Sequence, residues 1–124
     1  MNVVDSSGWL EYFADGPNSR HFAKPIESVR ELLVPSLSIT EVFKRILTQR
    51  GEDSALQAVA AMQQGRVVDL DVPIAIMAAK LGAELHLPLA DSVMLASARA
   101  HEAVLWTQDA DFKDAEDVKY FPKR

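Results

Sequence analysis

Four acidic side chains could carry chemistry in this sequence: Asp5, Glu41, Asp91 and Asp109. Clustered carboxylates repel one another, which raises their pKa values unless a cation is present. Oxygen ligands without cysteine or paired histidine suit Mg²⁺ or Mn²⁺ rather than Zn²⁺. Such an ion activates water for attack on a phosphodiester and stabilises the charge that develops. The four acids therefore predict metal-dependent phosphodiester hydrolysis, with either one ion or two.

Two of these acids also have a local structural interpretation at the start of a predicted helix. Ser38 and Glu41 have the spacing of a capping box, in which the Glu41 carboxylate would accept the backbone N–H of Ser38. Asp91 would favourably oppose the positive end of its helix dipole. Both alternatives stay open at the level of sequence.

The other two acids have similar alternatives. Asp5 would cap its own turn through Ser7, and Asp109 would organise the loop that follows it as an Asx-turn. These local roles are independent of one another, whereas a metal site explains all four acids together.

Length and composition define the class of protein. A chain of 124 residues with 48% hydrophobic content is expected to form a single domain over residues 1–124. The net charge of −5, from 13 Lys and Arg against 18 Asp and Glu, has the wrong sign for gripping nucleic acid by bulk charge. The absence of cysteine excludes disulfides and thiolate chemistry. No signal-like start and no membrane-length apolar run is present, so we expect a soluble, cytoplasmic protein that is not bound to a membrane.

Apolar periodicity and turn residues predict alternating strands and helices. The predicted strands cover residues 2–5, 32–35, 67–70 and 104–107, with a possible fifth at 118–121. The predicted helices are a short one after residues 6–7 and longer ones at about 22–31, 38–50, 52–64, 73–84 and 89–101. This order predicts an α/β fold, a three-layer α/β/α arrangement with a central, mostly parallel sheet of four to five strands.

The predicted elements bring the acids to one edge of that sheet. Asp5 and Asp109 follow strands, and ligands of open parallel sheets bind outside the carboxyl ends of the strands. Glu41 and Asp91 lie in the first turns of helices, whose N-termini meet the same edge. We therefore expect the four carboxylates to converge from distant parts of the chain.

Four sequence blocks in this order resemble the acidic motifs of PIN domains, at residues 4–10, 38–42, 87–92 and 105–112. The length and these blocks are most similar to VapC toxins of bacterial toxin–antitoxin pairs. The resemblance implies an α/β/α fold and Mg²⁺- or Mn²⁺-dependent endoribonuclease activity on RNA. It also implies a homodimer and inhibition by a cognate antitoxin protein.

The resemblance assigns the metal-binding and catalytic roles to four acids, Asp5, Glu41, Asp91 and Asp109. Thr107 matches the hydroxyl that supports the fourth acid, and Ser7 beside Asp5 is a further supporting residue. Some relatives place the fourth acid at the position of Asp111, so both assignments stay open. Residues 20–25 match no motif of the family.

Several other residues have two interpretations. Three basic residues lie on the helix that begins near Glu41: Lys44, Arg45 and Arg50. They either bind RNA phosphates or simply form the solvent-exposed face of that helix. The three histidines have no ligand spacing. Trp9 and Trp106 are expected to pack in the core, with base stacking as the alternative.

Three other functions remain to be tested. A PIN-domain nuclease could process RNA without being a toxin. A receiver-like signalling domain also gathers carboxylates and Mg²⁺ at strand ends, but it needs an acceptor Asp ending its third strand, where this chain offers only Asp69 and Asp71. A catalytically silent interaction module with the same fold is the third.

Overall fold

Five short strands form a central sheet in which every neighbouring pair is parallel. The computed structural model describes residues 1–124, and the order of the strands across the sheet is β3-β2-β1-β4-β5. Their bounds are β1 Asn2–Val4, β2 Leu32–Pro35, β3 Arg66–Val68, β4 Val104–Thr107 and β5 Val118–Tyr120. The predicted parallel sheet of four to five strands is confirmed.

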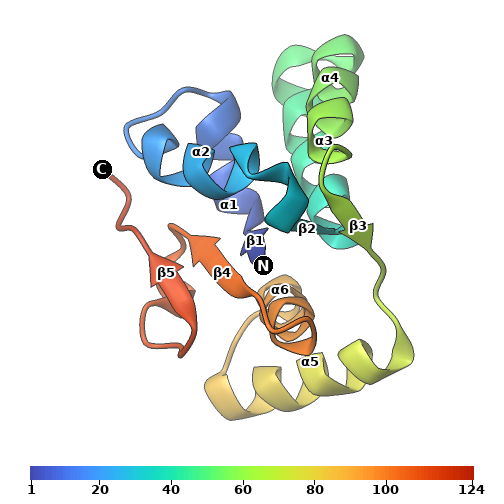
Figure 1. Ribbon diagram of the computed structural model, residues 1–124, viewed down its shortest axis with the longest axis vertical. Coiled ribbons are helices and arrows are strands. Elements are labelled where there is room, and N and C mark those ends of the chain that lie inside the picture. The colour runs from blue at the N-terminus through green and yellow to red at the C-terminus, as the bar shows by residue number, and fades with distance from the viewer.

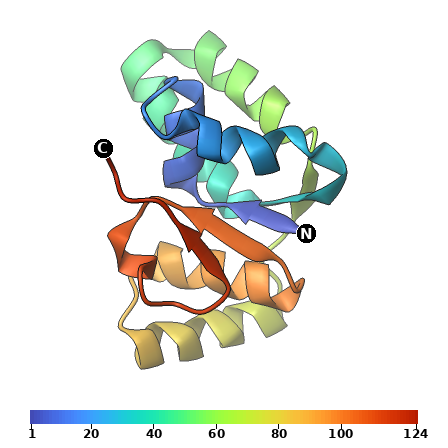
Figure 2. The ribbon, with the colours of Figure 1, turned by 60° about the vertical axis from the view of Figure 1, so that its left-hand side comes forward.

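Helices cover both faces of the sheet (Figures 1 and 2). One face carries α1 Ser6–Phe13, α2 Ser19–Glu27, α3 Ser36–Arg50 and α4 Glu52–Met62, and the other carries α5 Val72–Leu85 and α6 Leu89–Ala100. Two short 3₁₀ turns, η1 Val29–Glu31 and η2 Ala110–Phe112, complete the elements. The three-layer α/β/α architecture predicted from the sequence is therefore observed.

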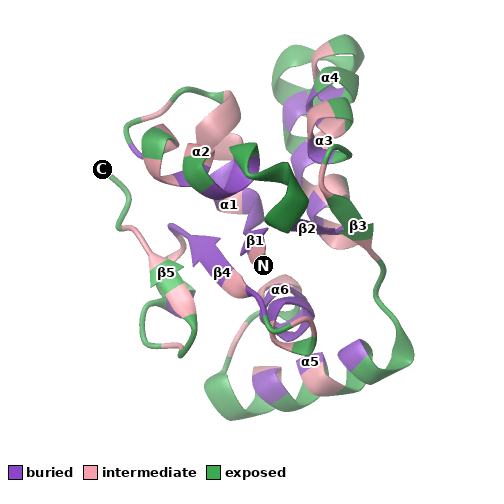
Figure 3. Cartoon of the chain, in the orientation of Figure 1, coloured by how far each residue is buried: buried purple, intermediate pink, exposed green.

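The central strands β2, β1 and β4 are buried on both faces, because successive side chains point to opposite sides of a strand and helices cover both sides of the sheet. Val3 and Leu105 pack on the side of α5 and α6. Their neighbours Val4 and Trp106 pack on the side of α1 to α4, against Trp9. Figure 3 shows β4 and β1 buried between helices whose outer sides are exposed, whereas the edge strands β3 and β5 are exposed or intermediate.

The second predicted helix is shifted along the chain. The sequence predicts it over about 22–31, but α2 runs from Ser19 to Glu27. It ends because Ser28 leaves the helical conformation and donates its hydroxyl to the carbonyl of Lys24 at 2.9 Å. A separate 3₁₀ turn follows before β2.

No single helix is long and apolar enough to cross a membrane. Only α5 and α6 taken together reach that length and composition, and they meet at a bend of 119°. Much of α6 is instead part of the core against the sheet.

The strand order places a crevice beside β1. The connection from β1 leads to β2 on one side, while β4 returns on the other, so β1 lies where the strand order reverses. Open α/β sheets bind ligands at such a switch point, outside the carboxyl ends of the strands. The residues that directly follow β1 and β4 therefore lie where such a sheet binds its ligand.

Candidate metal centre

Asp5 is a buried carboxylate at the carboxyl end of β1. Its backbone N–H donates to the carbonyl of Trp106 at 2.9 Å, which fixes it beside β4, and only 4% of the residue is exposed. Its Oδ2 accepts the hydroxyls of Thr107 at 2.9 Å and Ser7 at 3.0 Å. Burial raises the pKa of Asp5 to about 6, the nearby charge of Asp109 adds to the rise, and the hydroxyl hydrogen bonds oppose it.

Asp109 and Asp111 are held by the turn that follows β4. The Asp109 N–H donates to the hydroxyl oxygen of Thr107 at 2.9 Å. The Asp111 N–H donates to Oδ1 of Asp109 at 2.9 Å, so the predicted Asx-turn is present. That turn starts η2 and brings the Asp111 side chain to the same edge as Asp109.

Asp91 in the first turn of α6 completes a group of three carboxylates. One carboxylate oxygen from each of Asp91, Asp109 and Asp111 lies within 4.8 Å of the others. Burial raises the pKa of Asp91 to about 8, with further contributions from a hydrogen bond to Asp111 and from the charges of Asp109, Asp5 and Asp111. Without a cation, the group therefore retains a proton near neutral pH.

This group fits a hard divalent cation. All of its candidate ligands are carboxylate oxygens, the donors that Mg²⁺ and Mn²⁺ prefer. Beyond burial and the hydrogen bond, the charges of the three nearby aspartates raise the pKa of Asp91 and no basic group lowers it, which indicates negative charge without compensation. A bound cation would supply that compensation.

Glu41 does not form the capping box that the sequence allowed. Helix α3 begins two residues earlier than predicted, at Ser36, and has no side-chain cap. Ser38 is fully buried and donates its hydroxyl to the sulfur of Met94 at 3.3 Å. Glu41 instead accepts the hydroxyl of Ser6 through Oε1 at 2.7 Å. The capping interpretation is therefore wrong, and Glu41 is tied to the first turn of α1, outside the group of three.

A buried polar network behind the carboxylates was not predicted. Asn18, only 1% exposed, donates from Nδ2 to Oε1 of Gln108 at 3.1 Å and to the carbonyl of Pro122 at 2.9 Å. Gln108 stands between Thr107 and Asp109, so the network supports the loop that carries the acids. Gln108 could have been identified from the sequence, because it directly follows the predicted strand that became β4. No local pattern could have identified Asn18, because its hydrogen-bond partners are 90 or more residues away in the sequence.

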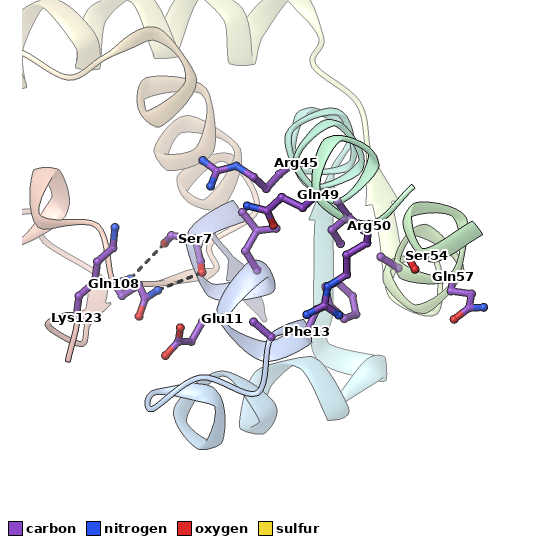
Figure 4. A pocket seen from close by; sticks show the side chains of 14 residues that line it. Ser7, Glu11, Phe13, Arg45, Gln49, Arg50, Ser54, Gln57, Gln108 and Lys123 are labelled. Carbon is purple, nitrogen blue, oxygen red and sulfur yellow. Dashed lines mark hydrogen bonds between the residues drawn. The ribbon is translucent and has the colours of Figure 1, made fainter. Parts of the chain in front are cut away.

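A cavity of about 610 Å³ lies among α1, α3 and α4 (Figure 4), and none of the grouped carboxylates lines it. Arg45 and Arg50 line it, as two of the three predicted RNA-binding residues, and Lys123 is a further cation. Ser7 and Gln108 line it as well, and Ser7 contacts Asp5. Lys44, the third predicted residue, is exposed and does not line this cavity.

The receiver-like alternative disagrees with the fold. Receiver domains have the order 2-1-3-4-5, whereas β3 is an edge strand here. Asp71 is also committed elsewhere, because its Oδ1 accepts the N–H of Ile74 at 3.0 Å and caps α5.

Comparison with known proteins gives a family and a fold. Residues 3–118 match the PIN domain. No curated protein matches the sequence. A toxin–antitoxin complex from Klebsiella pneumoniae is similar in structure, with a TM-score of 0.80 and 21% identity over 95% of each chain. The sarcin–ricin-loop-cleaving toxin VapC20 of Mycobacterium tuberculosis has a TM-score of 0.77 and 17% identity, over 94% of this chain and 95% of that one. DNA-bound VapBC from Salmonella typhimurium has a TM-score of 0.75 and 15% identity over 98% of each chain.

Proposed function

This chain belongs to the PIN-domain family, and from that premise we propose that it is a divalent-metal-dependent endoribonuclease, the toxin of a toxin–antitoxin pair. The observation that carries the proposal is the group of Asp91, Asp109 and Asp111 next to buried Asp5, at the switch point of the sheet. These acids come from three separated segments of the chain, and a metal site explains their convergence.

We assign metal binding to Asp5, Asp91 and Asp109, with Asp111 as a fourth or alternative ligand. Both side-chain hydrogen bonds to Asp5 end on Oδ2, and neither uses Oδ1. Mg²⁺ or Mn²⁺ suits this oxygen-only set. When bound, such an ion supplies Lewis-acid stabilisation of the phosphate charge and lowers the pKa of water beside it.

The protein's own residues orient the acids and handle protons. Thr107 and Ser7 hold the Asp5 carboxylate in one orientation. Asp91 would hold a cation in its deprotonated form, because carboxylate ligands bind metal without their proton. Ser6 holds Oε1 of Glu41, which leaves Oε2 to accept a proton from the attacking water or to bind a second ion.

We assign the cavity in Figure 4 to the RNA backbone near the scissile phosphate. Arg45 and Arg50 supply positive charge there, and Arg is suited to bidentate contacts with phosphate. Substrate binding thus depends on a local basic region of an otherwise acidic chain.

The partners are part of the same proposal. The similar structures include a toxin–antitoxin complex and a DNA-bound VapBC, which supports a cognate antitoxin. Exposed apolar side chains on α5 and α6 support a homodimer, with Val72 71%, Ile76 54% and Leu89 81% exposed. A short neighbouring gene that encodes a DNA-binding N-terminus would support the toxin role over general RNA processing.

The test is RNA cleavage by purified protein with Mg²⁺ or Mn²⁺ and with chelator. We expect cleavage only with metal, and loss of cleavage in Asp5→Asn and Asp91→Asn while circular dichroism stays unchanged. Asp69→Asn is the matched control, since Asp69 is exposed and lies outside the group. Full activity in chelator would refute the proposal, and so would a folded but fully active Asp91→Asn variant.

A further inference from the structure

A second cavity, of about 590 Å³, lies between α2 and the edge of the sheet formed by β4 and β5. We propose that it binds a single-stranded segment of the RNA substrate beyond the cleavage site, through phosphate contacts and base stacking. This inference rests on the proposed function and extends it. The residues that line the cavity, here called the α2–β5 patch, are Arg20, His21, Lys24, Trp106, Lys119, Tyr120 and Phe121.

Charge favours a polyanion at the α2–β5 patch. Three of the seven residues, Arg20, Lys24 and Lys119, are basic and exposed, and none is acidic. The chain as a whole carries a net charge of −5, so this is a local reversal of sign. Local positive potential attracts phosphate even on an acidic protein.

Stacked aromatic rings distinguish this patch from a surface that is only basic. His21 stacks on Phe121 with ring centres 4.2 Å apart and an interplanar angle of 12°. Phe121 in turn stacks on Trp106 at 6.0 Å. His21 and Phe121 are only half-buried, so their rings are accessible in part. Partly exposed aromatic rings beside cations are the usual platform for unpaired bases.

The two kinds of group are held together by the strand pattern. Lys119 and Phe121 are two residues apart along β5 and its end, so they lie on the same face of the sheet. Lys119 pairs with Trp106 on β4, which places Trp106 on that face as well. The Lys119 Nζ lies 4.5 Å from the centre of the Trp106 ring, a cation–π contact. The ammonium group is thus positioned before any ligand arrives.

The α2–β5 patch is joined to the metal centre by two hydrogen bonds. The Phe121 N–H donates to the carbonyl of Thr107 at 2.9 Å. The Thr107 hydroxyl donates to Asp5 at 2.9 Å. Trp106 of the patch and Thr107 beside Asp5 are neighbours on β4, so an RNA chain bound at the patch would lie next to the segment that supports the acids. The patch shares no residue with the cavity of Figure 4, so the two basic regions are separate.

The patch also gives a role to residues that the family motifs do not cover. Arg20, His21 and Lys24 belong to residues 20–25, which match none of those motifs. Helix α2 begins at Ser19, earlier than predicted, and carries all three residues to the patch. We infer that this segment contributes to substrate binding in this chain.

The test measures binding without cleavage. A fluorescent ten-nucleotide oligouridine is titrated with protein in chelator, and its anisotropy gives Kd at several salt concentrations. We expect Lys119→Gln to weaken binding and to make the slope of log K against log salt shallower by about 0.7. Lys80→Gln is the matched control, because Lys80 is also exposed but lies on α5, across the sheet, and this variant should bind as wild type does.

A second variant tests the rings. Phe121→Leu keeps an apolar side chain and removes the ring on which His21 stacks, so we expect about fivefold weaker binding or more at all salt concentrations. Urea unfolding of each variant confirms that it is folded. Wild-type affinity in both Lys119→Gln and Phe121→Leu would overturn the inference.

Further outcomes separate the inference from its alternatives. Duplex DNA bound as tightly as oligouridine would indicate charge attraction alone and overturn it. A changed oligomeric state in Lys119→Gln with unchanged RNA binding would assign the surface to a second copy of the chain and also overturn it. If wild type cleaves RNA with Mg²⁺ while both variants bind normally, only this inference fails. If wild type neither cleaves nor binds RNA, the proposed function fails with it.

Discussion

Asp5 and Asp109 are joined through a single hydroxyl group. Thr107 donates to Oδ2 of Asp5 at 2.9 Å and accepts the N–H of Asp109 at 2.9 Å. Thr107 is fully buried, so water cannot replace either bond. One side chain therefore sets the relative position of two acids that are 104 residues apart in the sequence.

Replacing Thr107 by Val should remove both bonds while keeping the shape of the side chain. Groups that orient metal ligands usually contribute about 10- to 100-fold to affinity or activity. We expect RNA cleavage to fall by about that factor, with Mn²⁺ affinity falling in parallel. Thr107→Ser retains the hydroxyl and should restore most of both. Equal losses in Val and Ser variants would indicate a packing effect instead.

The raised pKa values of Asp5 and Asp91 predict how stability depends on pH without metal. Their folded pKa values, about 6 and about 8, lie above those of unfolded carboxyls, so the folded state binds protons that the unfolded state has released. The stabilisation of the folded state by these protons is complete below about pH 4 and is lost as the pH rises to about 8. In chelator, the melting temperature should therefore fall across that range.

The same experiment has two controls. Asp91→Asn removes the group with the larger shift, so its melting temperature should fall less between pH 5 and pH 8. Mg²⁺ should raise the melting temperature of wild type at pH 8 by more than that of Asp5→Asn, because binding to the folded state stabilises it. A wild-type melting temperature that rises with pH in chelator would contradict the prediction.

The identity of the fourth acid is a separate question that metal binding can answer. Asp111 and Asp109 both belong to the group of three with Asp91, so we expect both to bind the ion. Calorimetric titration with Mn²⁺ should show about tenfold weaker binding, or more, for Asp111→Asn and for Asp109→Asn. Asp114→Asn, an exposed residue outside the group, is the control. Wild-type affinity in Asp111→Asn would leave Asp109 as the fourth acid.

Much of the fold was predictable because local patterns and global packing agree in this chain. Buried parallel strands such as residues 32–35 read as continuous apolar runs, and the turn at Gly51 separates two helices. The third strand was predicted at 67–70 and is observed at Arg66–Val68. The strand ends earlier because its pairing with β2 stops at Val68, and the two residues that follow are exposed.

The candidate site was predicted less completely because some of its contacts are tertiary. The positions of Asp5 and Asp109 after strands placed them at the correct edge of the sheet. The capping interpretation failed because the core takes up Ser38, which a local motif cannot reveal. The Ser6 hydrogen bond to Glu41 joins two helices that are distant in sequence. Periodicity reports which face a residue occupies but not which partner it meets there.

Asn18 offers the most direct test of whether the buried network supports the site. Asn18→Leu keeps a similar volume but leaves Oε1 of Gln108 and the carbonyl of Pro122 without their donor. A buried acceptor left unpaired costs about 1–3 kcal/mol, so we expect the free energy of unfolding in urea to fall by that amount. Ser19→Ala removes only an exposed 3.3 Å hydrogen bond to Asp15 and should change it by less than about 0.5 kcal/mol. Because Gln108 precedes Asp109, Asn18→Leu should also weaken Mn²⁺ binding under conditions where the variant is fully folded. Destabilisation with unchanged Mn²⁺ affinity would mean that Asn18 supports the fold but not the metal centre.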